Sequence, residues 1–93
     1  MQLTNQFKDF FGIPLTKAQN NTLSRLLKRI PEEIESSKIV GIDQFALLMC
    51  DVVPLDRNEA TVLYYVLGEM SEMCHDEKTI SRVESHRKWI IMD

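Results

Sequence analysis

Residues 54–84, PLDRNEATVLYYVLGEMSEMCHDEKTISRVE, repeat the pattern of residues 14–44, PLTKAQNNTLSRLLKRIPEEIESSKIVGIDQ, at a constant offset of 40 residues. Both stretches open with Pro-Leu and carry a basic residue at the fourth position. Their matched apolar residues are Leu23 with Leu63, Leu26 with Val66, Leu27 with Leu67, and Ile30 with Met70. A repeat of this period is typical of chains that duplicate one supersecondary unit. We therefore expect two copies of one unit.

Each copy begins with a predicted amphipathic helix. Its apolar residues recur at i, i+3, i+4 and i+7, the spacing that places side chains on one face of an α-helix. Thr16 and Asp56 precede the two helices as N-caps, and Gln19 and Glu59 follow three residues later, which is the pattern of a capping box. Pro31 predicts the end of the first helix, because proline disfavours the α conformation in the residue before it.

A second helix is expected in each copy. In the first copy Asp43 predicts its N-cap, and its apolar face comprises Phe45, Leu48, Met49 and Val52. Its other residues are also largely apolar, so we expect this helix to be the most buried element. In the second copy an extended pair, Thr79-Ile80, precedes a helix over residues 82–92.

The whole chain is predicted to be one all-α domain, residues 1–93. Residues 1–13 hold a short helix over residues 5–11, capped by Thr4 and ended by Gly12. Residues 14–53 form the first helix-loop-helix repeat and residues 54–93 the second. The burial of both apolar faces against each other explains why two copies are needed.

Composition favours a soluble cytoplasmic protein. The 93 residues are 44% hydrophobic, which suffices for one modest core. The chain has no apolar run of the roughly 18 residues that a membrane span needs, and residues 1–12 lack the pattern of a signal peptide. Cys50 and Cys74 lie among apolar residues, so we expect free thiols in a reducing compartment.

Charge is distributed unevenly, although the formal net charge is only −3. Lysine and arginine dominate residues 1–30, and acidic residues dominate residues 31–76. Proteins that bind nucleic acids usually carry a concentrated basic surface. The distribution therefore disfavours nucleic acid and favours a basic partner peptide.

The predicted unit is a helix, a polar loop ending in a β-branched residue, an acid or amide four residues later, and a second helix. This arrangement resembles the EF-hand, whose helix, calcium loop and helix pair with a second unit through a short contact between the loops. On this resemblance Val40 and Ile80 occupy the β positions, and Gln44 and Glu84 occupy the last-ligand positions. The resemblance covers residues 14–92 and implies two tandem EF-hand-like units.

The ligand positions depart from the EF-hand pattern. Gln44 is neutral where the family uses a bidentate carboxylate, and Lys38 and Lys78 stand where it uses glycine. A lysine ammonium repels a divalent cation. We therefore expect a degenerate, calcium-independent module with no cofactor. An alternative is a calcium sensor with one residual site, whose candidate ligands are Glu33, Glu35 and Ser37.

The resemblance implies a protein-interaction module. Such paired units bind an amphipathic helix of another protein in an apolar groove between their helices. We expect the same function here, with no membrane partner and with the oligomeric state left open. The residues expected to line the groove are Phe45, Met49, Leu63, Leu67, Met70 and Trp89.

Residues 79–85, TISRVES, also resemble the recognition helix of a helix-turn-helix repressor. This alternative is a small DNA-binding transcriptional regulator. Its expected DNA-contacting residues are Ser81, Arg82, Arg87 and Lys88.

Catalytic and zinc-binding patterns are lacking in the sequence. No paired C-x-x-C or H-x-x-x-H spacing is present, and the three glycines form no phosphate-binding loop. The spacing of serine, histidine, cysteine and acidic residues indicates no nucleophile with an adjacent base. We therefore expect no enzymatic activity.

Overall fold

The computed structural model describes residues 12–30 and 41–92, which contain four α-helices and no strand. The helices are α2 (Lys17–Leu27), α4 (Ile42–Cys50), α5 (Arg57–Met73) and α6 (Glu77–Met92). This confirms the all-α class. The expected helix over residues 5–11 and the ligand candidates Glu33, Glu35 and Ser37 lie outside the described residues.

The start of α2 is the predicted capping box. The Thr16 hydroxyl accepts a hydrogen bond from the Gln19 N–H at 3.1 Å, and the Gln19 side-chain oxygen accepts from the Thr16 N–H at 2.8 Å. These bonds satisfy two of the N–H groups that a helix start leaves unpaired. All four residues of the predicted apolar face are buried: Leu23, Leu26 and Leu27 lie in α2, and Ile30 lies just beyond its end.

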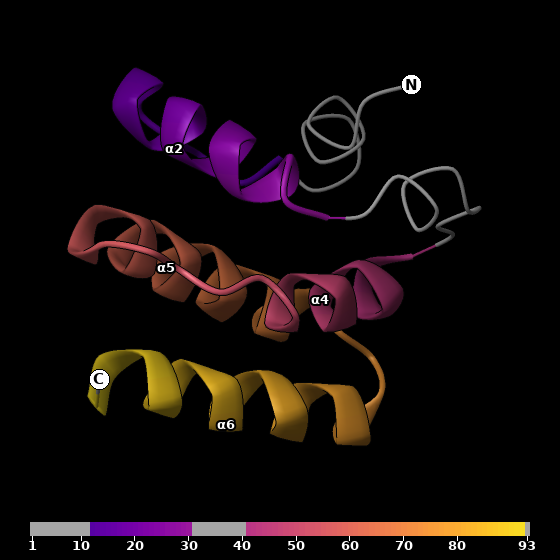
Figure 1. The fold of residues 1–93 in the computed structure, drawn as a ribbon. Coiled ribbons are helices and arrows are strands. Elements are labelled where there is room, and N and C mark those ends of the chain that lie inside the picture. The colour runs from indigo at the N-terminus through magenta and orange to yellow at the C-terminus, as the bar shows by residue number, and fades with distance from the viewer. Residues whose placement is uncertain (1–11, 31–40, 93) are drawn as a thin grey trace.

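Helix α5 lies at the centre of the domain, between α2 and α6, with α4 beside it (Figure 1). Its predicted apolar face is completely buried and comprises Leu63, Val66, Leu67 and Met70. Polar contacts also tie α5 to the N-terminal half: the Tyr65 hydroxyl donates to the Pro14 carbonyl, and the Asn58 amide donates to the Thr22 hydroxyl. One helix thus buries surface against all three of the others.

Helix α4 is buried on one side only. Phe45, Ala46, Met49 and Cys50 lie in the core, whereas Leu47 is exposed. The predicted N-cap, Asp43, was wrong: Gly41 is the N-cap and makes no side-chain cap bond. The Asp43 carboxylate instead accepts from the N–H groups of His75 and Asp76, at 2.8 to 3.2 Å. It therefore fixes the turn between α5 and α6.

Helix α6 begins earlier than predicted. Only residues 74–76 separate it from α5, and the expected extended pair Thr79-Ile80 is helical, so that prediction was wrong. The physical reason is Asp76, whose carboxylate accepts from both the N–H and the hydroxyl of Thr79, at 3.0 and 2.9 Å. Residues 77–84 are consequently helical and do not form the loop ending at Glu84 that the EF-hand resemblance implied.

Helix α6 runs back along α5 as an antiparallel hairpin (Figure 1). Near the turn the Ser71 hydroxyl donates to the Glu84 carboxylate at 2.8 Å, and farther along the Arg87 Nε donates to the Tyr64 carbonyl at 3.1 Å. Gly68 permits the approach, because a Cβ there would lie 2.6 Å from the Arg87 guanidinium. In the part of the chain that the structure describes, no helix is long and apolar enough to cross a membrane.

Candidate surface pocket

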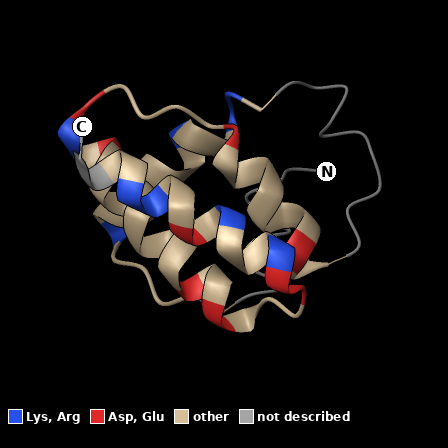
Figure 2. Cartoon of the chain, turned by 90° about the horizontal axis from the view of Figure 1, so that it is seen from below, with Lys and Arg blue, Asp and Glu red and all other residues tan. Residues whose placement is uncertain are grey.

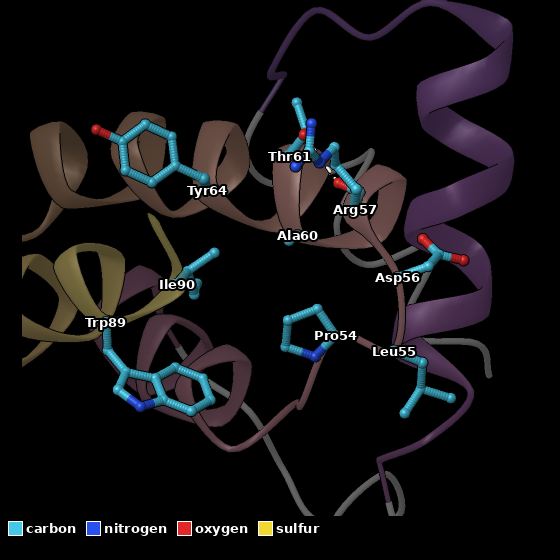
Figure 3. Close-up of a pocket in the computed structure, with 9 residues that line it drawn as sticks. All are labelled: Pro54, Leu55, Asp56, Arg57, Ala60, Thr61, Tyr64, Trp89 and Ile90. Carbon is cyan, nitrogen blue, oxygen red and sulfur yellow. Dashed lines mark hydrogen bonds between the residues drawn. The ribbon is translucent and has the colours of Figure 1, made fainter. Parts of the chain in front are cut away.

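A pocket of about 610 Å³ opens between the linker that precedes α5, the first half of α5 and the last part of α6 (Figure 3). In Figure 3 Trp89, Pro54, Ile90 and Ala60 are arranged around this space. The full lining comprises Pro54, Leu55, Asp56, Arg57, Ala60, Thr61, Tyr64, Trp89 and Ile90.

Large apolar side chains are exposed around this pocket. Trp89 is 49% exposed, Leu55 is 74% exposed, and Val53 in the same linker is 57% exposed. Single exposed apolar residues are common, but a cluster beside a cavity marks a binding surface. Tryptophan is also among the residues that contribute most to binding energy at protein interfaces.

Most polar groups of the pocket already form hydrogen bonds within the domain. The Asp56 carboxylate accepts from the Glu59 N–H at 2.8 Å and caps α5. The Thr61 hydroxyl donates to the Arg57 carbonyl. Arg57 is exposed at the rim of the pocket. Among the described residues, no carboxylate lies within ion-pair distance of its guanidinium.

Tyr64 is fixed as one wall of the pocket. The Arg87 guanidinium lies over its ring, 4.0 Å from the centroid, and is itself held by the Tyr64 carbonyl and by Glu84 at 3.0 Å. A cation over an aromatic face is attracted by the ring quadrupole. The position of this wall therefore depends on the contacts between α5 and α6.

The linker is held by an ion pair whose carboxylate is buried and whose guanidinium is partly exposed. Glu59 is 3% exposed, and its two carboxylate oxygens each accept from the Arg29 guanidinium at 2.6 Å. One of them also accepts from the Leu55 N–H at 2.9 Å. The Arg29 guanidinium, followed by the Leu55 N–H, lowers the pKa of Glu59 to about 2. The linker that lines one side of the pocket is therefore held in place by Glu59.

A histidine of α6, His86, does not itself line the pocket but contacts the lining residue Trp89. His86 stacks on Trp89, with ring centroids 5.4 Å apart and planes 22° from parallel. Its Nε2 atom is buried and has no hydrogen-bond partner in the structure. Burial, followed by the charge of Arg82, lowers the pKa of His86. Both effects favour the neutral imidazole.

The predicted groove residues fall in two places. Trp89 lines the pocket, but the other five lie in the core and are at most 1% exposed: Phe45, Met49, Leu63, Leu67 and Met70. They line no surface groove among the described residues, because they lie inside the hydrophobic core. The pocket residues that the sequence did not single out include Pro54, Leu55, Tyr64 and Ile90.

The predicted DNA-contacting residues are also divided. Ser81, Arg82 and Lys88 are exposed on α6, where Figure 2 shows basic residues on the side turned to the viewer. Arg87 is only 21% exposed and packs against α5. Arg82 lies 3.7 Å from Asp51. Helix α2, which carries Lys17 and Arg25, lies across α5 from α6 (Figure 1).

Metal ligands do not gather in the part of the chain that the structure describes, where no group of three or more His, Cys, Asp or Glu side chains is placed to hold an ion. Cys50 and Cys74 are free thiols, and burial raises the pKa of both, that of Cys74 to about 11. Neither thiol is ionised at neutral pH.

Comparison with known proteins adds no relative: no family model, curated protein or solved structure matches the chain.

Proposed function

We propose that this domain is a protein-interaction module that binds an amphipathic helix of a partner through the pocket around Trp89. The observation that carries the proposal is the cluster of exposed Trp89 and Leu55 at the mouth of a cavity of about 610 Å³. Burial of such surface by a partner contributes about 25 cal/mol for each Å² of apolar area removed from water.

The chemistry of the rim supports a particular kind of partner. The apolar floor fits one or two large aliphatic or aromatic side chains, which an amphipathic helix presents at i and i+3 or i+4. Arg57 offers a cation without an ion pair, so an acidic residue of the partner helix is complementary to it. The partner proposed here is thus acidic near this contact, unlike the basic peptide expected from the overall charge distribution.

Binding without catalysis is part of the proposal. The Asp56 carboxylate caps α5 and the Thr61 hydroxyl is bonded to the backbone. These groups leave the pocket without a nucleophile held by an adjacent base, which acyl or phosphoryl transfer needs. The proposal involves no calcium.

A displayed library of helical peptides tests this function, because it samples many sequences at once and needs no chosen partner. Wild-type protein is expected to enrich helical peptides with apolar residues at i and i+3 or i+4 and an acidic residue beside them. These peptides should bind Leu55→Glu at least about tenfold more weakly, since the variant places a carboxylate in the apolar contact. Fluorescence of Trp89, the only tryptophan, measures the affinity in both proteins.

Leu47→Glu is the matched control. Leu47 is the remaining exposed large apolar residue among those described, and it lies on α4 and does not line the pocket. The selected peptides should bind this variant as they bind the wild type. Equal binding to Leu55→Glu, or a selection that enriches no common pattern, would contradict the proposed function.

A further inference from the structure

His86 is the one side chain among those described whose buried polar atom has no partner. It also supports a wall of the pocket, because it stacks on Trp89. A neutral imidazole tolerates one nitrogen without a hydrogen bond, but a protonated imidazole donates from both nitrogens. A buried donor without an acceptor is costly, and a buried charge is more so.

Among the residues that the structure describes, none offers an acceptor for a proton added at His86 Nε2. The charged groups that act on the ring are Arg82 on α6 and Asp51 at the end of α4, and they lie 3.7 Å from each other. Cys50 on α4, which the same two groups affect, is a neutral thiol. The other nearby cation of α6, Arg87, packs against Tyr64 on α5.

We propose that His86 makes the pocket sensitive to acid: when its imidazole takes up a proton, the ring leaves the stack with Trp89 and the α6 wall of the pocket opens. The charged ring gains hydration only by moving toward solvent, and Trp89 loses the surface that holds it. Partner binding at this pocket, which rests on the proposed function, therefore weakens as the pH falls below the ordinary range of histidine.

Two measurements on the free protein test the acid response without any ligand. The chain has two histidines, so an NMR titration of the imidazole protons in His75→Gln follows His86 alone. His86 should titrate below the ordinary pKa of histidine, about 6.5. Over the same range, acrylamide quenching of Trp89 fluorescence should increase about twofold, because the indole gains exposure, while the circular dichroism stays helical.

Matched variants assign the effect to His86. His86→Phe keeps an aromatic ring against Trp89 but has no proton to gain, so its quenching should not change between about pH 7.5 and about pH 5. His75→Gln should retain the wild-type change. The proposal is overturned if His86→Phe retains the change, or if His86 titrates while the exposure of Trp89 stays constant.

Peptide binding separates this inference from the proposed function. For a peptide selected as above, the affinity should fall by up to about tenfold per pH unit below the titration of His86, and it should stay constant in His86→Phe. A peptide that binds the wild type equally at every pH overturns the acid response and leaves the function standing. A quenching change without any selected peptide supports the acid response and contradicts the function.

Discussion

Two polar groups near the pocket differ in how well they are satisfied. The carboxylate of Glu59 accepts two hydrogen bonds from Arg29 and one from the backbone of Leu55. The Nε2 atom of His86 is buried and accepts none. A buried group with all its partners stabilises one arrangement, whereas a buried group without partners changes its surroundings when its charge changes. We therefore expect Glu59 to stabilise the fold, and we expect the surroundings of His86 to change when its imidazole is protonated.

Removing Glu59 should give the largest loss of stability. Glu59→Ala leaves Arg29 without its partner and the Leu55 N–H without its acceptor, and it frees the linker that forms the base of the pocket. We expect the free energy of unfolding to fall by about 3 kcal/mol, measured by urea denaturation. Glu72→Gln, at an exposed site on the same helix, should change it by less than about 0.5 kcal/mol. If both variants lost only a little stability, Glu59 would not be the stabilising site that we infer from its hydrogen bonds.

Acid should act on the two sites in separate pH ranges. The pKa of Glu59 is lowered from 4.5 to about 2 in the folded protein, so its contribution to stability is complete above pH 4.5 and is lost as the pH falls toward 2. The pKa of His86 is also lowered, from 6.5, so the stability that its neutral form provides declines as the pH falls below 6.5. Urea denaturation across this range should show two separate declines. His86→Phe should lack only the one at higher pH.

The two arginines of α6 should differ in their contribution to stability. Arg87 packs on Tyr64 and donates to its carbonyl, so Arg87→Ala should lower the free energy of unfolding by about 1 to 2 kcal/mol. Arg82 is exposed and forms an exposed ion pair with Asp51, so Arg82→Ala should cost less than about 0.5 kcal/mol. Thermal denaturation compares them. A DNA-binding α6 predicts instead that both variants weaken duplex binding while stability is unchanged.

Local patterns predicted much of the fold. The apolar spacing of α2 and α5 placed every matched residue in the core, and the capping box of Thr16 and Gln19 formed as expected. Both signals involve residues within two turns of one helix, so sequence alone contains them. The start of α6 was missed because the repeat transferred the pattern around Asp43 to the second copy, where Asp76 caps the helix earlier.

The sequence repeat did not predict the pocket, because residues that match at the offset of 40 have different neighbours in the structure. Met49 and Trp89 occupy the same position in the two copies, yet Met49 is completely buried and Trp89 is half exposed. Helix α4 packs its inner side against both α5 and α6, whereas the end of α6 extends beside the linker. Leu15 packs against the core, and its counterpart Leu55 is exposed. Tertiary contacts, which the repeat does not encode, decide both differences.

Changes at the mouth of the pocket should have the smallest effect on stability. Leu55→Ser removes a side chain that is 74% exposed but keeps the N–H that donates to Glu59, so the free energy of unfolding should change by less than about 0.5 kcal/mol. The selected peptides should nevertheless bind this variant more weakly, measured by Trp89 fluorescence. If the variant keeps its stability and loses peptide binding, Leu55 contributes to recognition of the peptide. A large loss of stability would instead place Leu55, like Glu59, among the residues that hold the linker.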